Sequence, residues 1–200
     1  MSKLILDKPL SGKEDIREFD LFGNAEISFP KEALRIETKE GEAVLLSTGS
    51  FPSDVRIEWE FKPVECAGRA EVIFAAKNSP GSDNAGGDSV CGNYFRLSYY
   101  RRKDDEEKSF HLSKLEKSVA GRTDEVCICP DPLPDEIKDW YKMCVTKNKD
   151  IVSFFINGFE VLRFEDDKMK YDELLTGGRI GFVQEAFVTA EYRNLKVTWI

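Results

Sequence analysis

Apolar and polar residues alternate with the period of a β-strand along most of the chain. The clearest case is Asp54–Pro63, whose apolar residues alternate with charged ones: Val55, Ile57, Trp59 and Phe61. Successive side chains of a strand point to opposite faces of a sheet, so this segment predicts a strand with one buried and one polar face. Sustained helical periodicity is hard to find, and we expect an all-β protein.

The same alternation, interrupted by turn residues, predicts about a dozen strands. Besides Asp54–Pro63 they are Lys3–Lys8, Asp15–Phe22, Asn24–Phe29, Ala33–Thr38, Ala43–Ser47, Arg69–Ala76, Tyr94–Arg102, Glu125–Cys129, Tyr141–Lys147, Ile151–Ile156, Phe159–Phe164, Arg179–Gln184 and Thr189–Ile200. Asn157-Gly158 is a strong signal for a two-residue hairpin turn. Lys77–Gly92 is the longest predicted loop, Glu136–Trp140 predicts one helical turn at most, and Lys168–Leu175 predicts a loop or short helix.

Many short strands with almost no helix leave a sandwich or a barrel as the fold. Two hundred residues without a linker or repeat predict a single domain over 1–200. The hairpin at Asn157-Gly158, followed by the glycine-rich strand Gly177–Phe182, resembles the end of laminin-G and concanavalin-like jelly rolls. The fold that we predict is a concanavalin A-like lectin/glucanase jelly-roll sandwich of two antiparallel sheets.

Composition narrows the classes of partner. With 29 Lys and Arg against 37 Asp and Glu, the net charge is −8, which argues against nucleic acid or an anionic membrane as the main partner. The N-terminus lacks the features of a signal peptide, and an odd count of five cysteines favours reduced thiols, so we expect a cytoplasmic protein. The acidic loops lack a full set of calcium ligands, and one histidine makes a transition-metal cage improbable; we predict no metal and no cofactor.

One predicted strand carries a row of polar and aromatic side chains. On one face it presents two phenols, two guanidinium groups and a hydroxyl: Tyr94, Arg96, Ser98, Tyr100 and Arg102. Aromatic rings can cover the apolar faces of a sugar, and arginine donates forked hydrogen bonds to hydroxyls or to a carboxylate. The row therefore predicts a sugar-binding surface, with a solvated sheet face that ends in a charged hairpin as the alternative.

Glu58 and Glu60 are the first candidates for catalysis. Their spacing on a strand places their Cα atoms about 6.5–7 Å apart on one face, which is compatible with the carboxyl pairs of retaining or inverting glycosidases. The alternative is a charge-balanced edge formed with Arg56 and Lys62.

A polysaccharide lyase would need a group that neutralises a uronate and a base that abstracts a proton. Arg96 and Gln184 could neutralise the uronate, with Tyr94 or Tyr100 as the base, or His111 in its place. The alternative for His111 is an ordinary surface residue.

Several stretches resemble, in order, the YesU-like family. They are Asp54–Pro63 with Gly68-Arg69-Ala70, Tyr94–Arg102, Phe110–Ser118, Asp131–Pro134, and Gly177–Phe182 with Glu191–Leu195. The resemblance implies a concanavalin A-like jelly roll from bacterial gene neighbourhoods that take up and degrade plant cell-wall polysaccharides, with no assigned reaction. The family tends to place a histidine after the third stretch, where this chain has Val119–Arg122, which puts any role of that histidine in doubt here.

These features together predict a carbohydrate-active protein whose concave face binds plant cell-wall oligosaccharides, among them uronate-containing ones. Its first candidate activity is that of a glycoside hydrolase with Glu58 and Glu60 beside the Tyr94–Arg102 row. A non-catalytic carbohydrate-binding module, a polysaccharide lyase-like enzyme and an interaction protein without sugar affinity remain as alternatives.

Overall fold

Thirteen strands make up nearly all of the regular structure in the computed structural model, which describes residues 2–66, 68–78, 92–99, 112–130, 139–168 and 173–200. The strands are β1 (Lys3–Lys8), β2 (Phe19–Ser28), β3 (Leu34–Ser47), β4 (Val55–Cys66), β5 (Ala70–Asn78), β6 (Gly92–Tyr99), β7 (Leu112–Val119), β8 (Arg122–Pro130), β9 (Tyr141–Asn148), β10 (Ile151–Ile156), β11 (Phe159–Glu165), β12 (Arg179–Glu185) and β13 (Val188–Trp199). Two 3₁₀ turns, η1 (Lys13–Ile16) and η2 (Pro30–Glu32), are the helical segments of the described chain. The all-β prediction is confirmed.

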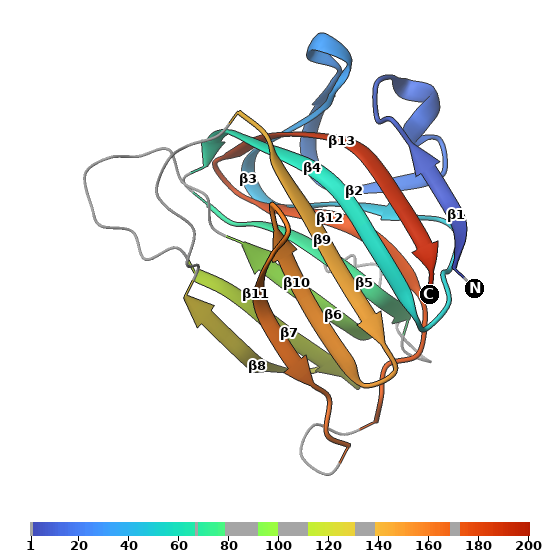
Figure 1. Ribbon diagram of the computed structural model, residues 1–200. Coiled ribbons are helices and arrows are strands. Elements are labelled where there is room, and N and C mark those ends of the chain that lie inside the picture. Colours follow the sequence, from blue (N-terminus) through green and yellow to red (C-terminus); the bar gives the residue numbers. More distant parts are fainter. Residues whose placement is uncertain (1, 67, 79–91, 100–111, 131–138, 169–172) are drawn as a thin grey trace.

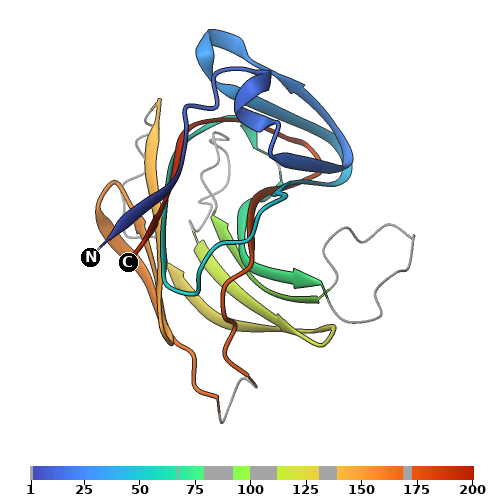
Figure 2. The ribbon, with the colours of Figure 1, turned by 90° about the vertical axis from the view of Figure 1, so that its right-hand side faces the viewer.

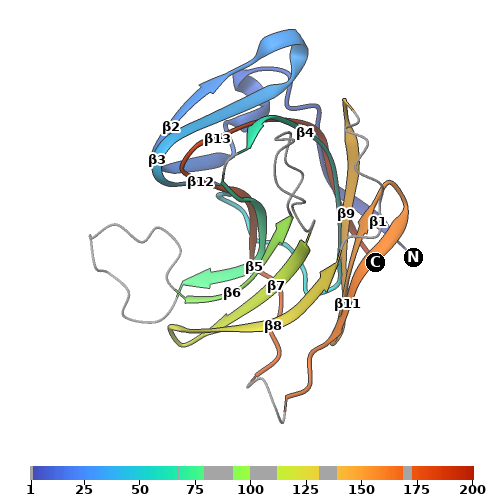
Figure 3. The same cartoon turned by 90° about the vertical axis from the view of Figure 1, so that its left-hand side faces the viewer.

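The strands form two layers (Figure 1). The first layer runs β1-β13-β4-β9-β10-β11, and the second runs β2-β3-β12-β5-β6-β7-β8, with antiparallel pairing throughout. β3 joins the layers because its first half pairs with β13 and its second half with β12. Figures 2 and 3 show the second layer curving, with its outer face on the inside of the curve. The predicted two-sheet sandwich is therefore present.

Aromatic rings from both layers fill the space between them. Trp59 of β4 lies 5.9 Å from Tyr99 of β6 and 6.0 Å from Phe182 of β12, measured between ring centroids. Tyr192 of β13 stacks on Phe182 at 4.4 Å. The predicted inward residues of Asp54–Pro63 and of Tyr94–Tyr99 are all buried, as strand parity requires.

The hairpin between β10 and β11 turns at Asn157-Gly158, as predicted. Both residues have positive φ, 52° and 85°, which is the backbone that a two-residue hairpin turn needs and that Asn and Gly tolerate best. This hairpin pairs β10 with β11 at one edge of the first layer, with a register shift between Phe154 and Phe155.

Several predictions of local structure were wrong. Asp15–Phe22 and Asn24–Phe29 contribute to one strand, β2, and β7 was not predicted. Asp15–Phe22 does not begin as a strand, because Asp15 accepts hydrogen bonds from the backbone N–H and the hydroxyl of Ser11 (2.7 and 3.1 Å) and folds the chain into η1. Ala33–Thr38 and Ala43–Ser47 are one strand, β3, which continues through exposed residues at Gly41. The predicted helical turn at Glu136–Trp140 lies mostly outside the described residues.

Candidate functional site

The outer face of the second layer carries a continuous group of interacting charged side chains. Strand alternation directs Tyr94, Arg96 and Ser98 of β6 outward, because Phe95, Leu97 and Tyr99 point into the core. Neighbouring strands add charged residues to the same face. The group, called here the Arg96 face, consists of Glu42, Arg69, Glu71, Arg96, Ser98, Lys114, Glu116 and Glu185.

Arg96 is at the centre of this face and holds two carboxylates. Its Nη2 lies 2.5 Å from Glu42 of β3, and its Nε donates to Glu71 of β5. The hydroxyl of Ser98 also donates to Glu71, at 2.5 Å. The Glu71 side chain is fully buried, whereas 42% of the Glu42 side chain is exposed. The face thus has a buried anchor and an accessible rim.

Arg69 links Glu71 to a third carboxylate, Glu185, at the end of β12. Burial raises the pKa of Glu71, and this exceeds the opposing effect of Arg96 and of the Ser98 hydroxyl. For Glu185, burial also acts to raise the pKa, but the hydrogen bond and charge of Arg69 outweigh it and the pKa is lowered. Neighbouring carboxyl groups on this face therefore differ in how readily they take up a proton.

Beside these charged groups the same outer face has a small apolar cluster. Val44, Leu46, Ile73 and Val183 are buried there, with Tyr94 packed against them. The Tyr94 ring consequently lies at the boundary between the charged and apolar parts of the face.

Glu58 and Glu60 lie on the other side of the sandwich. They alternate with Ile57 and Trp59, which point into the core, so both carboxylates face outward from the first layer. The expectation that they lie beside Tyr94 and Arg96 is therefore wrong: two layers and the core separate the two sets. Sequence alternation gives the face of a single strand but not which faces of different strands coincide.

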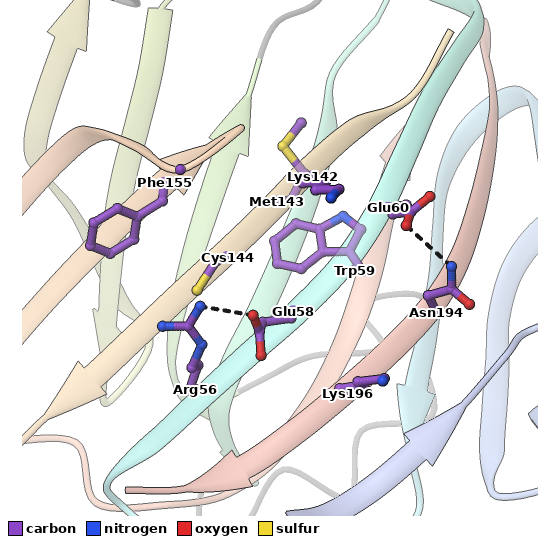
Figure 4. Close-up of a pocket in the computed structure, with 11 residues that line it drawn as sticks. Arg56, Glu58, Trp59, Glu60, Lys142, Met143, Cys144, Phe155, Asn194 and Lys196 are labelled. Atoms are coloured by element: carbon purple, nitrogen blue, oxygen red, sulfur yellow. Dashed lines mark hydrogen bonds and ion pairs between the residues drawn. The ribbon is translucent and has the colours of Figure 1, made fainter.

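Glu58 and Glu60 line a cleft of about 780 Å³ over β4, β9 and β13, shown in Figure 4 and called here the Glu58 cleft. Arg56 binds Glu58 at 2.8 Å. Arg193 binds Glu60 at 2.7 Å and lies over the ring of Trp140, 4.0 Å from its centroid. Each carboxylate is therefore held by an arginine.

The remaining predicted site residues are dispersed. Gln184 points into the sandwich, is buried, and donates a hydrogen bond of 2.8 Å to the Tyr192 hydroxyl, so it does not lie on the Arg96 face. Tyr100, Arg102 and His111 lie outside the described residues. In the part of the chain that the structure covers, no three His, Cys, Asp or Glu side chains are grouped to hold a metal ion, and no helix is long and apolar enough to cross a membrane.

The site predicted from the sequence did not include Glu42, Arg69, Glu71 or Glu185. One signal was available: Glu71 is a single charged residue within the otherwise apolar run Ala70–Ala76. An isolated carboxylate in such a run must be paired on folding. Its partners, however, come from strands that the sequence does not place next to one another.

Comparisons with known proteins agree with this architecture. The chain is 33% identical to the uncharacterized protein YesU of Bacillus subtilis (strain 168), over 94% of this chain and 92% of that protein. A Bacillus subtilis protein of unknown function with a galectin-like fold superposes with a TM-score of 0.84 at 32% identity, covering 98% and 95% of the two chains.

More distant structures share the fold. The carbohydrate-binding module CBM66 of Bacillus subtilis has a TM-score of 0.62 at 15% identity, with 89% of this chain and 93% of that chain covered. A β-glucanase of Bacillus licheniformis has a TM-score of 0.66 at 10% identity, with 99% and 98% covered. These similarities confirm the predicted jelly-roll sandwich. Residues 3–197 match the family described as a domain of unknown function, DUF1961, and the chain belongs to this YesU-like family.

Proposed function

We propose that this protein binds oligosaccharides on the Arg96 face. The observation that carries the proposal is the interlocked group of Arg96, Glu71 and Glu42 on the inside of the curved sheet. Sugars are recognised through many hydroxyl groups, each of which both donates and accepts hydrogen bonds. A surface that combines guanidinium donors with carboxylate acceptors matches that chemistry.

The ion pairs support binding because they fix the side chains before a ligand arrives. Arginine has five N–H donors and a carboxylate can accept about four hydrogen bonds, so the pairs leave further groups for a ligand. Side chains that are already ordered lose little conformational entropy when the ligand binds. Tyr94, at the edge of the face, could cover the apolar face of a sugar ring.

Charge on this face favours neutral sugars over carboxylated ones. Its described residues include four carboxyl groups, Glu42, Glu71, Glu116 and Glu185, against three cations, Arg69, Arg96 and Lys114. Arg96, which the sequence singled out for a uronate, already contacts two carboxylates. A neutral oligosaccharide would add no further negative charge.

The fold neighbours are consistent with this proposal. They include the carbohydrate-binding module, the carbohydrate recognition domain of Emp47p and the β-glucanase. The same sandwich therefore occurs in proteins that bind sugars and in proteins that cleave them. The fold alone does not determine whether a protein binds or cleaves a sugar; the side chains of the site determine it.

A binding assay with two substitutions on the Arg96 face tests the proposal. We expect neutral oligosaccharides from a cell-wall panel to bind the wild type, and Glu42→Ala or Glu116→Ala to weaken binding about tenfold or more, because each removes a charged hydrogen-bonding group. Isothermal titration calorimetry measures the affinities. Glu26→Ala removes an exposed carboxylate of β2 that pairs with Lys39, and as the control it should change nothing. Binding that survives both substitutions on the Arg96 face would contradict the proposal.

Hydrolysis of a glycosidic bond is the second candidate, and the lowered pKa of Glu185 favours it, because an ionised carboxylate can act as a general base. In that reaction Glu185 would take a proton from the attacking water while a second accessible carboxyl group of the face protonates the leaving oxygen, so that the C–O bond breaks and one water is added. Glu71 has no exposed surface and does not reach a bound sugar. Mass spectrometry of incubated sugars would show products heavier by one water. Glu185→Gln should reduce their formation by about 100-fold or more.

The assignment of acid and base to Glu58 and Glu60 stays a prediction, and the same incubations test it. A Glu58→Gln, Glu60→Gln double variant would lose products only if the reaction takes place in the Glu58 cleft. Products whose masses add up to the mass of the substrate, with no water added, would indicate elimination instead.

A further inference from the structure

The Glu58 cleft (Figure 4) is a second concave surface. Strand parity and the layer assignment place it on the opposite side of the sandwich from the Arg96 face. Its volume of about 780 Å³ falls within the range of small-molecule sites. Buried Trp59 and Met143 belong to its floor. The cleft therefore rests on the core and has a fixed shape.

The charges of the cleft favour an anion, although the whole chain carries −8. Its lining includes three cations, Arg56, Lys142 and Lys196, and two carboxylates, Glu58 and Glu60. Both carboxylates already have an arginine partner. The cleft thus contains more positive charge than its own carboxylates neutralise.

The two lysines are available to a ligand. Lys142 forms no ion pair with any residue of the described chain, and the carboxylate nearest to Lys196 is that of Asp7, at 3.9 Å. That distance is beyond a hydrogen bond. Two ammonium groups at the cleft can therefore each bind an anionic group.

Strand register sets the spacing of these lysines. Lys142 of β9 is paired with Glu60, and Lys196 of β13 is paired with Glu58, so the lysines flank β4 on opposite sides. Two interstrand spacings, together with the two-residue offset between Glu60 and Glu58, place the Cα atoms of the two lysines about 12 Å apart. This spacing suits two carboxylates on separate rings of an oligomer.

The rest of the lining suits sugar rings. Phe155, opposite Cys144 in the register, is half-buried and offers an aromatic surface. The Cys144 thiol adds no charge at neutral pH, because burial raises its pKa to about 11. Asn194, which donates to Glu60 at 3.2 Å, also has an amide oxygen that can accept a hydrogen bond.

We infer that the Glu58 cleft is a second saccharide site, specific for oligosaccharides that carry carboxylates on more than one ring, with Lys142 and Lys196 each binding one carboxylate. This inference is independent of the Arg96 face, because no residue is shared between the two surfaces.

Calorimetric titration of trigalacturonate against the whole protein tests the inference. We expect binding that Lys142→Ala and Lys196→Ala each weaken about threefold to tenfold and that the double variant largely abolishes. Fully methyl-esterified trigalacturonate, which keeps the rings and loses the charges, should bind at least tenfold more weakly. Binding should also fall as salt rises from about 0.1 to about 1 M, since the contacts are ionic and exposed.

Two control variants separate this site from the others. Lys39→Ala removes an exposed lysine of β3 outside the cleft and should leave the affinity unchanged. Glu42→Ala, on the Arg96 face, should also leave trigalacturonate binding intact. The inference is overturned if the ester binds as well as the acid, if the double lysine variant retains full affinity, if Glu42→Ala abolishes binding, or if trigalacturonate does not bind at all.

Discussion

Glu71 lies in an environment that a carboxylate does not prefer. Its carboxyl group has no exposed surface, yet it lies on the outer face of a sheet and contacts Arg96 and Ser98. Burying a carboxylate is costly unless it is paired and hydrogen-bonded. The pairing explains how the chain tolerates this group, and the raised pKa shows that burial is only partly offset.

The pH dependence of stability tests this description of Glu71. Because its folded pKa is raised above 4.5, the folded state binds the proton more tightly than the unfolded chain does. The group therefore contributes stability below its unfolded pKa, and this contribution is lost as pH rises through the folded pKa. We expect the wild type to lose stability relative to Glu71→Gln as pH rises from the unfolded pKa of 4.5 through the raised pKa of the folded state, measured by urea unfolding. If the stability of the wild type relative to Glu71→Gln stayed constant or rose with pH, Glu71 would not be desolvated.

Alternation predicted the direction of individual side chains well. It placed Phe95, Leu97 and Tyr99 inside and Tyr94 and Arg96 outside, as the structure does. Gln184 was predicted to bind a ligand because of its amide group, and the parity of its position on the strand was not used. Gln184 follows Phe182 by two positions and therefore faces the core with it, where Tyr192 accepts its hydrogen bond.

At the scale of elements, strands that begin and end at clear turn residues were predicted closely. β10 and β11 agree with the predicted segments because Asn157-Gly158 fixes the turn between them. β3 was divided because Gly41 and the charged residues around it look like a loop, whereas the strand continues through them. On both sides of Gly41, pairing with β2 and with two further strands holds β3 extended and outweighs local propensity.

Close packing between central strands gives a prediction at this scale. Gly181 of β12 lies between β3 and β5, and a Cβ atom there would be 2.3 Å from the carbonyl oxygen of Leu45. Gly181→Ala should therefore lower the free energy of unfolding by about 1–3 kcal/mol, since the backbone of two strands must move.

Gly49→Ala is the matched control for this substitution, because a Cβ atom at Gly49 meets nothing within 4 Å. It should change stability by less than about 0.5 kcal/mol. Urea unfolding of both variants decides the comparison, and an equal effect at the two positions would show that β12 is not tightly packed.

At the scale of the whole molecule, the sandwich follows from strand number, the near absence of helix and the resemblance of the C-terminal third to concanavalin-like folds. The relation between the two candidate surfaces does not follow from the sequence. Glu58 and Arg96 are 38 positions apart in sequence, and only the layer assignment shows that they face opposite sides. The single site predicted from the sequence, with Glu58 and Glu60 beside Arg96, is therefore two separate surfaces of different charge.

Nuclear magnetic resonance mapping of the bound sugar distinguishes the Arg96 face from the Glu58 cleft. Isotope-labelled protein is titrated with the tightest-binding neutral oligosaccharide of the panel, and the amide signals that shift are assigned. Binding on the Arg96 face predicts shifts concentrated in β3, β5, β6, β7 and β12, and their loss in Glu42→Ala. Shifts confined to β4, β9 and β13, or no shift with any sugar of the panel, would contradict the account.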